Sequence, residues 1–191
     1  MLPMKKLVLI IIILGFTITS FGQAGTCEQS DPFCTSNIYT FPAGVNTGSA
    51  QSGPYYGCLG STPNPAWYHM KIAIEGNINI FMYTTPSKDI DFICWGPFTN
   101  FNTMCAQLNT APIEDCSYSA SWNETCQING AISGEFYMLL ITNYSNQNCN
   151  ISFSQTAGNG TTNCCIIAGN AGDDNALSLC QNDTTFNMFN Q

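Results

Sequence analysis

Short runs of alternating apolar and polar residues, separated by Gly, Pro and Asn, fill most of the chain after its first 25 residues. In residues 77–84, for example, Ile78, Ile80 and Met82 project to one side of an extended chain and the residues between them to the other. No later stretch sustains a 3.6-residue period long enough for a substantial helix. We therefore predict an all-β fold with strands over Ile38–Phe41, Trp67–Ile74, Asn77–Thr84, Ile90–Trp95, Glu135–Asn143 and Asn150–Gln155.

The segments between these strands predict how the strands are connected. Glu75-Gly76-Asn77 reads as the turn of a hairpin. Pro and Gly crowd Phe41–Pro65, which predicts a long ordered loop held by Cys58, and Asn100–Gln127 reads as a second loop-rich region. Antiparallel strands joined in this way pack best as two face-to-face sheets, so we expect a β-sandwich of jelly-roll-like form.

The N-terminus has the three-part layout of a secretory signal peptide. Lys5 and Lys6 precede an apolar run over Leu7–Phe16 that is too short to span a bilayer, and small and polar residues follow. We expect cleavage near Gly22–Gly25, with Ala24 as the last residue of the signal and Gln23 as the alternative. The organisation predicted is a signal over 1–24, a β-sandwich over 26–156, a linker over 157–172 and, over 173–191, the start of a second module that is cut off, so that further C-terminal modules are expected.

Eleven cysteines lie beyond the signal. In an exported chain their irregular spacing predicts a disulfide framework, and a zinc site is the weaker alternative because there is no CxxC pair and only one histidine. Because eleven is odd, one thiol is left over, and Cys180, in the tail, is the candidate. The predicted half-cystines are Cys27, Cys34, Cys58, Cys94, Cys105, Cys116, Cys126, Cys149, Cys164 and Cys165.

The net charge of the chain limits the classes of molecule that it can bind. After the signal only Lys71 and Lys88 oppose twelve acids, a net charge of about −10, and there is no arginine. Nucleic acids and anionic lipids are therefore poor partners. We expect a secreted or cell-surface protein without a membrane span in the mature chain, and an extracellular protein or glycan surface as its partner.

Several strand landmarks resemble those of a known family. Trp67-Tyr68, Gly76–Ile80, Asp89–Phe92 and Gly134–Tyr137, followed by apolar residues up to Ile141, are similar to the bacterial pre-peptidase C-terminal domain. That family is a small β-sandwich often appended to secreted proteases and surface proteins, and the likeness covers about Ala66–Gln155.

Asp89–Phe98 and Ile141–Asn146 also resemble a cysteine-rich module near the N-terminus of large secreted proteins of gliding Bacteroidetes. Such proteins commonly end in a sorting domain for gliding-associated, type IX secretion. This resemblance implies adhesion or surface display, and it does not imply an enzyme.

Carboxylates are the candidate metal ligands. Asp89 and Asp91 stand two residues apart at the entry to a predicted strand, and Glu114, Asp115 and Glu124 lie in the loop-rich region. Together with backbone carbonyls they would supply the oxygen ligands that Ca²⁺ prefers. The alternative, which we favour, is that they serve turn chemistry and solvation.

Catalytic constellations are weak in this sequence. His69 is the only histidine, no Gly-x-Ser-x-Gly elbow accompanies it, and a satisfied strand residue is the favoured interpretation. The adjacent Glu114 and Asp115 do not straddle a glycosidic bond at the separation that a glycosidase needs. A secreted hydrolase is therefore the third hypothesis.

Aromatic residues provide the remaining candidate site. Trp67 and Trp95 belong to apolar strands and read as core anchors, whereas Tyr118 and Trp122 lie in a polar loop where they are candidates for stacking on a sugar ring. The blander alternative, which we favour, is that Trp122 covers a disulfide. The sequence thus predicts a non-catalytic module for adhesion or display, with a carbohydrate-binding module as the second hypothesis.

Overall fold

The computed structural model describes residues 24–163, 166–167 and 178–179. The predicted signal peptide, the vicinal cysteines Cys164 and Cys165, Cys180 and most of the predicted second module lie outside the described residues. Among the described residues no helix is long and apolar enough to cross a membrane.

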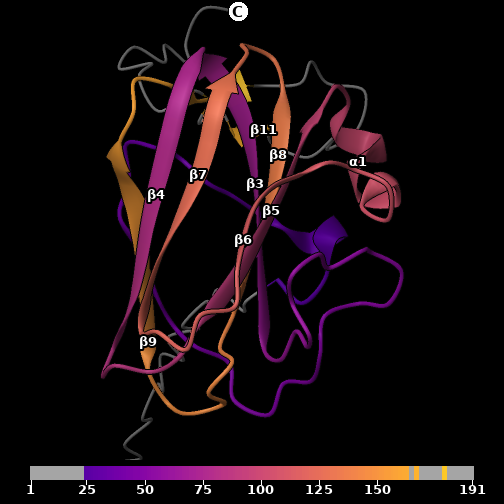
Figure 1. Ribbon diagram of the computed structural model, residues 1–191. Coiled ribbons are helices and arrows are strands. Elements are labelled where there is room, and N and C mark those ends of the chain that lie inside the picture. The colour runs from indigo at the N-terminus through magenta and orange to yellow at the C-terminus, as the bar shows by residue number, and fades with distance from the viewer. Residues whose placement is uncertain (1–23, 164–165, 168–177, 180–191) are drawn as a thin grey trace, which may run out of the picture.

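Two large sheets form the sandwich in the described part of the chain, and Figure 1 shows them facing each other; β11 (Ile166–Ile167) and β12 (Ser178–Leu179) pair as a separate two-stranded sheet. The first has the spatial order β1 (Asp31–Pro32), β3 (Pro65–Ile74), β8 (Phe136–Thr142), β5 (Asp91–Phe98) and β6 (Ile113–Ser117), and β10 (Thr161–Thr162) also pairs with β3. The second has the order β2 (Tyr39–Pro42), β9 (Asn150–Ala157), β4 (Gly76–Thr85) and β7 (Asn123–Ala131). The other described elements are η1 (Cys27–Gln29) and α1 (Phe101–Gln107).

The predicted all-β sandwich is confirmed, and each of the six predicted strands overlaps an observed one. Within the two facing sheets the pairs are antiparallel apart from the short β1, which runs parallel to β3. The alternation predicted for β4 is also observed, since Ile78, Ile80 and Met82 are fully buried and Tyr83 is exposed.

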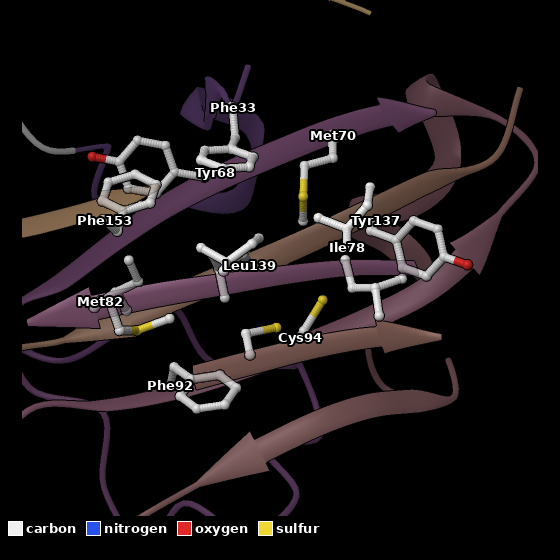
Figure 2. Packing of buried hydrophobic residues seen from close by; sticks show 14 of the residues in the cluster. Phe33, Tyr68, Met70, Ile78, Met82, Phe92, Cys94, Tyr137, Leu139 and Phe153 are labelled. Atoms are coloured by element: carbon white, nitrogen blue, oxygen red, sulfur yellow. The ribbon is translucent and has the colours of Figure 1, made fainter. Parts of the chain in front are cut away.

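The core between the sheets is continuous and mostly aliphatic and aromatic. From the first sheet it receives Met70, Phe92 and Leu139, and from the second Met82 and Phe153, all at most 1% exposed. Figure 2 shows these side chains converging between the strands. Burial on this scale supplies most of the driving force for folding.

The opposite face of the first sheet is buried too. Trp67 and Trp95 lie there, fully buried and stacked with ring centroids 5.6 Å apart, which confirms them as core anchors. Met104 of α1 and parts of the loop over residues 43–64 cover them. The molecule therefore has three layers, and the outermost consists of α1 and irregular chain (Figure 1).

Disulfides attach this outer layer. Cys27 of η1 bonds to Cys105 of α1, and Cys58 of the long loop bonds to Cys116 of β6, which confirms these four as half-cystines. Cys34 is also disulfide-bonded. Cys94, Cys126 and Cys149 differ from the expectation, because in the structure they are buried thiols.

The predicted hairpin at Glu75-Gly76-Asn77 is wrong. β3 and β4 belong to opposite sheets: β3 pairs with β8, and β4 pairs with β7 and β9. Gly76 has a φ of +141° and takes the chain from one sheet to the other. A turn signal shows where a strand ends, but it does not show which strand becomes the partner.

The loop-rich interpretation of Asn100–Gln127 is only partly right, because α1, β6 and the first half of β7 lie there. In β7 only alternate residues such as Cys126 and Ile128 are buried, and polar side chains separate them. In β6 the acids Glu114 and Asp115 interrupt the apolar pattern that would indicate a strand. Both are edge strands, for which hydrophobic patterning is weakest.

The predicted domain end at residue 156 is too early. β10 pairs with β3 across Thr161–Ile74 and Thr162–Ile72, and the Asn163 amide donates to the Lys71 carbonyl at 2.7 Å. Residues 157–163 were expected to form a linker. Ala157 instead ends β9 of the second sheet, and Thr161 and Thr162 add β10 to the first sheet.

Candidate calcium and ligand-binding site

Three of the five predicted calcium ligands gather at one end of the sandwich. Asp91 is the first residue of β5, Asp89 lies just before it, and Glu124 lies at the start of β7. The Ile90 amide donates to the Ser121 carbonyl at 3.1 Å, which ties the β5 entry to the segment leading into β7. Backbone pairing therefore brings carboxylates from both sheets together.

The surroundings of these carboxylates oppose their negative charge. Burial, together with the charges of Asp89 and Glu124, raises the pKa of Asp91 to about 7. Burial likewise raises the pKa of Asp89 and of Glu124, although a hydrogen bond from Ser121 to Asp89 and one from Ser117 to Glu124 act in the opposite direction. The three carboxyls form a cluster that favours either protons or a cation.

Two oxygens in this cluster have no hydrogen-bond donor. Asp89 Oδ1 and Glu124 Oε1 are buried without a partner in the described structure. Neither lysine beyond the signal supplies one, because Lys88 Nζ donates to Gln147 at 2.6 Å and Lys71 Nζ lies over the Phe136 ring. Buried anionic oxygens without donors are costly unless a cation or a proton reaches them.

Glu114 and Asp115 have a different role from the one predicted. Asp115 Oδ2 accepts the Gln127 amide at 2.7 Å, and Glu114 Oε1 accepts the Asn129 amide at 2.9 Å. These carboxylates of β6 therefore replace missing backbone partners along the edge of β7. The sequence shows that the two acids are adjacent. It does not show that they accept hydrogen bonds from amides of β7, because β7 was not predicted as a strand.

Carboxylate oxygens are donors of the kind that Ca²⁺ takes, but the three side chains are too few for a complete site. In the described part of the chain, no group of three or more His, Cys, Asp or Glu side chains is placed so that it could hold a metal ion. Ca²⁺ takes about six to eight oxygen ligands, and it accepts backbone carbonyls and side-chain amides as well as carboxylates. Asp89, Asp91 and Glu124 would therefore supply only part of a coordination shell, with loop oxygens and water completing it.

Exposed aromatic rings adjoin the cluster. Tyr118 is 70% exposed and Trp122 is 45% exposed, and both belong to the segment between β6 and β7. The Trp122 carbonyl accepts the Thr84 amide at 2.9 Å, so the backbone of this segment is fixed to the end of β4. The two predicted stacking residues thus present much of their surface to solvent.

Tyr83 is an aromatic residue of this region that the sequence analysis did not single out. It pairs with Asn123, the neighbour of Trp122, and its ring stacks on Phe81 with centroids 5.8 Å apart. Its position on the outer face of β4 was readable from the alternation. Its nearness to Trp122 was not, because the β4–β7 pairing was not predicted.

His69 is placed as expected for a satisfied strand residue. Its Nδ1 lies 3.0 Å from both the hydroxyl and the carbonyl oxygen of Ser30, and its ring packs against Phe101. Burial lowers its pKa, which favours the neutral imidazole. The contacts that hold it are structural.

Comparison with known protein families gives no match, and comparison with curated proteins gives none either. Among solved structures, the chain is similar to the pre-peptidase C-terminal domain of a collagenase from Bacillus anthracis, with a TM-score of 0.44 and 9% sequence identity. The similarity covers 66% of this chain and 94% of that domain.

Proposed function

We propose that the chain is a non-catalytic extracellular module of a larger secreted or surface protein, that it supports adhesion or display, and that Ca²⁺ braces its loops. The observation that carries the calcium proposal is the cluster of Asp89, Asp91 and Glu124, with two buried carboxylate oxygens that lack donors. Disulfides between surface elements support an oxidising, extracytoplasmic location. Export by the type IX pathway and a link to gliding are the more specific part of this proposal, and they rest on the sequence resemblance.

Isothermal titration with Ca²⁺ tests the metal site directly. We expect the oxidised chain to bind Ca²⁺, and we expect Asp91→Asn to weaken binding by at least about tenfold because it removes a charged ligand. Glu75→Gln is the matched control, since Glu75 is an exposed acid at the other end of β4. Equal affinities in all three proteins, or no heat of binding in the parent chain, would refute the site.

A second candidate function is glycan binding, and the exposure of Tyr118 and Trp122 favours it. Aromatic faces of this kind stack on the apolar faces of sugar rings. On a glycan array we expect Trp122→Ala to lose any binding that the parent chain shows. Tyr55→Ala should retain it, because Tyr55 is 61% exposed but belongs to the loop over residues 43–64.

A hydrolase remains the competing class. A screen against protease and glycosidase substrates separates it from the proposed module, and we expect no turnover. Activity that disappears in His69→Ala or Glu124→Ala would overturn the proposal.

A further inference from the structure

Two cysteines face each other across the middle of the sandwich. Cys94 lies in β5 of the first sheet, in register with Leu139 of β8, and Cys126 lies in β7 of the second sheet, in register with Ile80. Both side chains are fully buried in the core between the sheets. Figure 2 shows Cys94 within this core, among the side chains of Ile78, Phe92 and Leu139.

β5 and β7 lie against each other across the core, and Cys94 and Cys126 belong to the same buried cluster. The nearby Cys94 side chain raises the pKa of Cys126, as expected for two neighbouring thiols. Cys149, the third thiol in the described part of the chain, lies at the start of the segment entering β9, and its charged neighbour is Lys88. Among the thiols that the structure describes, Cys94 and Cys126 are therefore the pair that lies on facing strands of opposite sheets and is completely buried.

The same chain already carries disulfides at Cys27–Cys105 and Cys58–Cys116. A compartment that oxidises those pairs also exposes Cys94 and Cys126 to oxidant while the chain is still folding. Once the core has closed, the neighbouring Cys94 thiol and burial raise the pKa of Cys126, so the nucleophilic thiolate is suppressed. Oxidation must therefore precede or accompany the closure of the two sheets.

We propose that Cys94 and Cys126 form a third disulfide in the mature protein, which joins β5 of one sheet covalently to β7 of the other. The oxidant is a disulfide of a thiol oxidase or of a small thiol. The thiolate of one cysteine attacks that disulfide, which breaks its S–S bond and releases one oxidant thiolate. The second cysteine, as its thiolate, attacks the mixed disulfide and releases the other oxidant thiolate, so two protein thiols lose two protons and two electrons and one oxidant disulfide becomes two thiols.

Peptide mapping of the chain after export through an oxidising compartment tests this assignment. The protein is denatured, alkylated without reductant, digested and analysed by mass spectrometry. We expect a linked peptide that contains Cys94 and Cys126 and that disappears after reduction. Alkylation of both residues in the unreduced sample, or a linkage of either to another cysteine, would overturn the proposal.

Substitutions provide a second measurement. Cys94→Ala should leave Cys126 open to alkylation after denaturation without reductant, and the thermal midpoint should fall by about 10 °C. Cys149→Ala is the control, because it removes another buried cysteine and should leave the Cys94–Cys126 linkage intact. If Cys94→Ala does not fold, the linked peptide in the parent chain decides the question alone.

Discussion

Among the carboxyl groups that the structure describes, Asp91 has the surroundings that most oppose its negative charge. Its side chain is 3% exposed, and burial together with Asp89 and Glu124 raises its pKa to about 7. In the unfolded chain the same carboxyl has its ordinary pKa of 3.8. The folded state therefore binds a proton more tightly than the unfolded state, and ionisation of Asp91 opposes folding.

The sign of the pH dependence follows from this difference. With metal removed by a chelator, we expect the free energy of unfolding to increase as the pH falls from about 8.5 toward 6.5, because Asp91 becomes protonated in the folded state. Asp91→Asn should be more stable than the parent chain at the higher pH and should flatten this dependence. Urea unfolding at both pH values provides the measurement.

The pH range of this test ends near 6.5, because below that pH the ionisation of His69 changes the free energy of unfolding in the opposite direction. Burial lowers the pKa of His69 from its ordinary value of 6.5, so the stability that its neutral form contributes is lost as the pH falls further. The parent chain and Asp91→Asn share this effect. Identical slopes for the two proteins above pH 6.5 would contradict the role assigned to Asp91.

The sequence allowed part of this site to be predicted. The sequence shows which acids are candidates in a chain with few basic residues. Three of these candidates, Asp89, Asp91 and Glu124, do lie near one another in the structure. The different role of Glu114 and Asp115 was hidden, because it requires the backbone of β7 to lie beside β6. Long-range strand pairing decides which acids remain free, and residue type alone does not contain that information.

At the scale of elements, Asp115 joins the edges of the two sheets. Its Oδ1 accepts the Cys116 amide at 2.8 Å and its Oδ2 accepts the Gln127 amide at 2.7 Å. We expect Asp115→Ala to cost about 1.5–3 kcal/mol in the free energy of unfolding, as for other hydrogen bonds to charged groups. Asp115→Asn retains one carbonyl acceptor and should lose less. A urea titration in which both variants match the parent would contradict this role.

Asn64 fixes the long loop to the sandwich. Its Oδ1 accepts the Thr47 amide at 2.9 Å, and its Nδ2 donates to the Asn143 carbonyl at 3.1 Å. Its φ of +50° is a conformation that asparagine tolerates better than most residues. We expect Asn64→Ala to cost about 2–3 kcal/mol, because buried polar groups lose their partners.

Urea unfolding and limited proteolysis of the loop over residues 43–64 measure this effect together. Asn129→Ala serves as the control, since Asn129 is an exposed residue of β7. Unchanged proteolysis and stability in Asn64→Ala would show that the loop is held by other contacts.

The elements also show where sequence patterns succeed and fail. β3, β4 and β8 contribute to the core and carry strong apolar signals, so their existence could be predicted. β6 and β7 are edge strands: β6 is half-buried throughout and carries acids, and β7 has a largely exposed polar face, so their apolar signals were too weak. The turn at Gly76 was found, yet its crossing between sheets depends on partners far away in sequence.

At the scale of the whole molecule, disulfides hold an irregular outer layer over the Trp67–Trp95 stack. Cys58–Cys116 closes a loop with a sequence separation of 58 residues. We expect the double variant Cys58→Ala/Cys116→Ala to lose about 2–4 kcal/mol in the free energy of unfolding. Reductant should then lower the free energy of unfolding less in the variant than in the parent chain. Equal stabilities of the two oxidised proteins would show that packing alone holds this layer.

The central claim is that a cation completes the acidic end of the sandwich. The thermal unfolding midpoint of the oxidised chain from Ala24 onward, measured with excess Ca²⁺ and with chelator, tests it most directly. A ligand that binds only the folded state raises stability by mass action, so we expect the midpoint to rise by several degrees with Ca²⁺ in the parent chain and not in Asp91→Asn. The same midpoint with and without Ca²⁺, or an equal rise in both proteins, would contradict the claim.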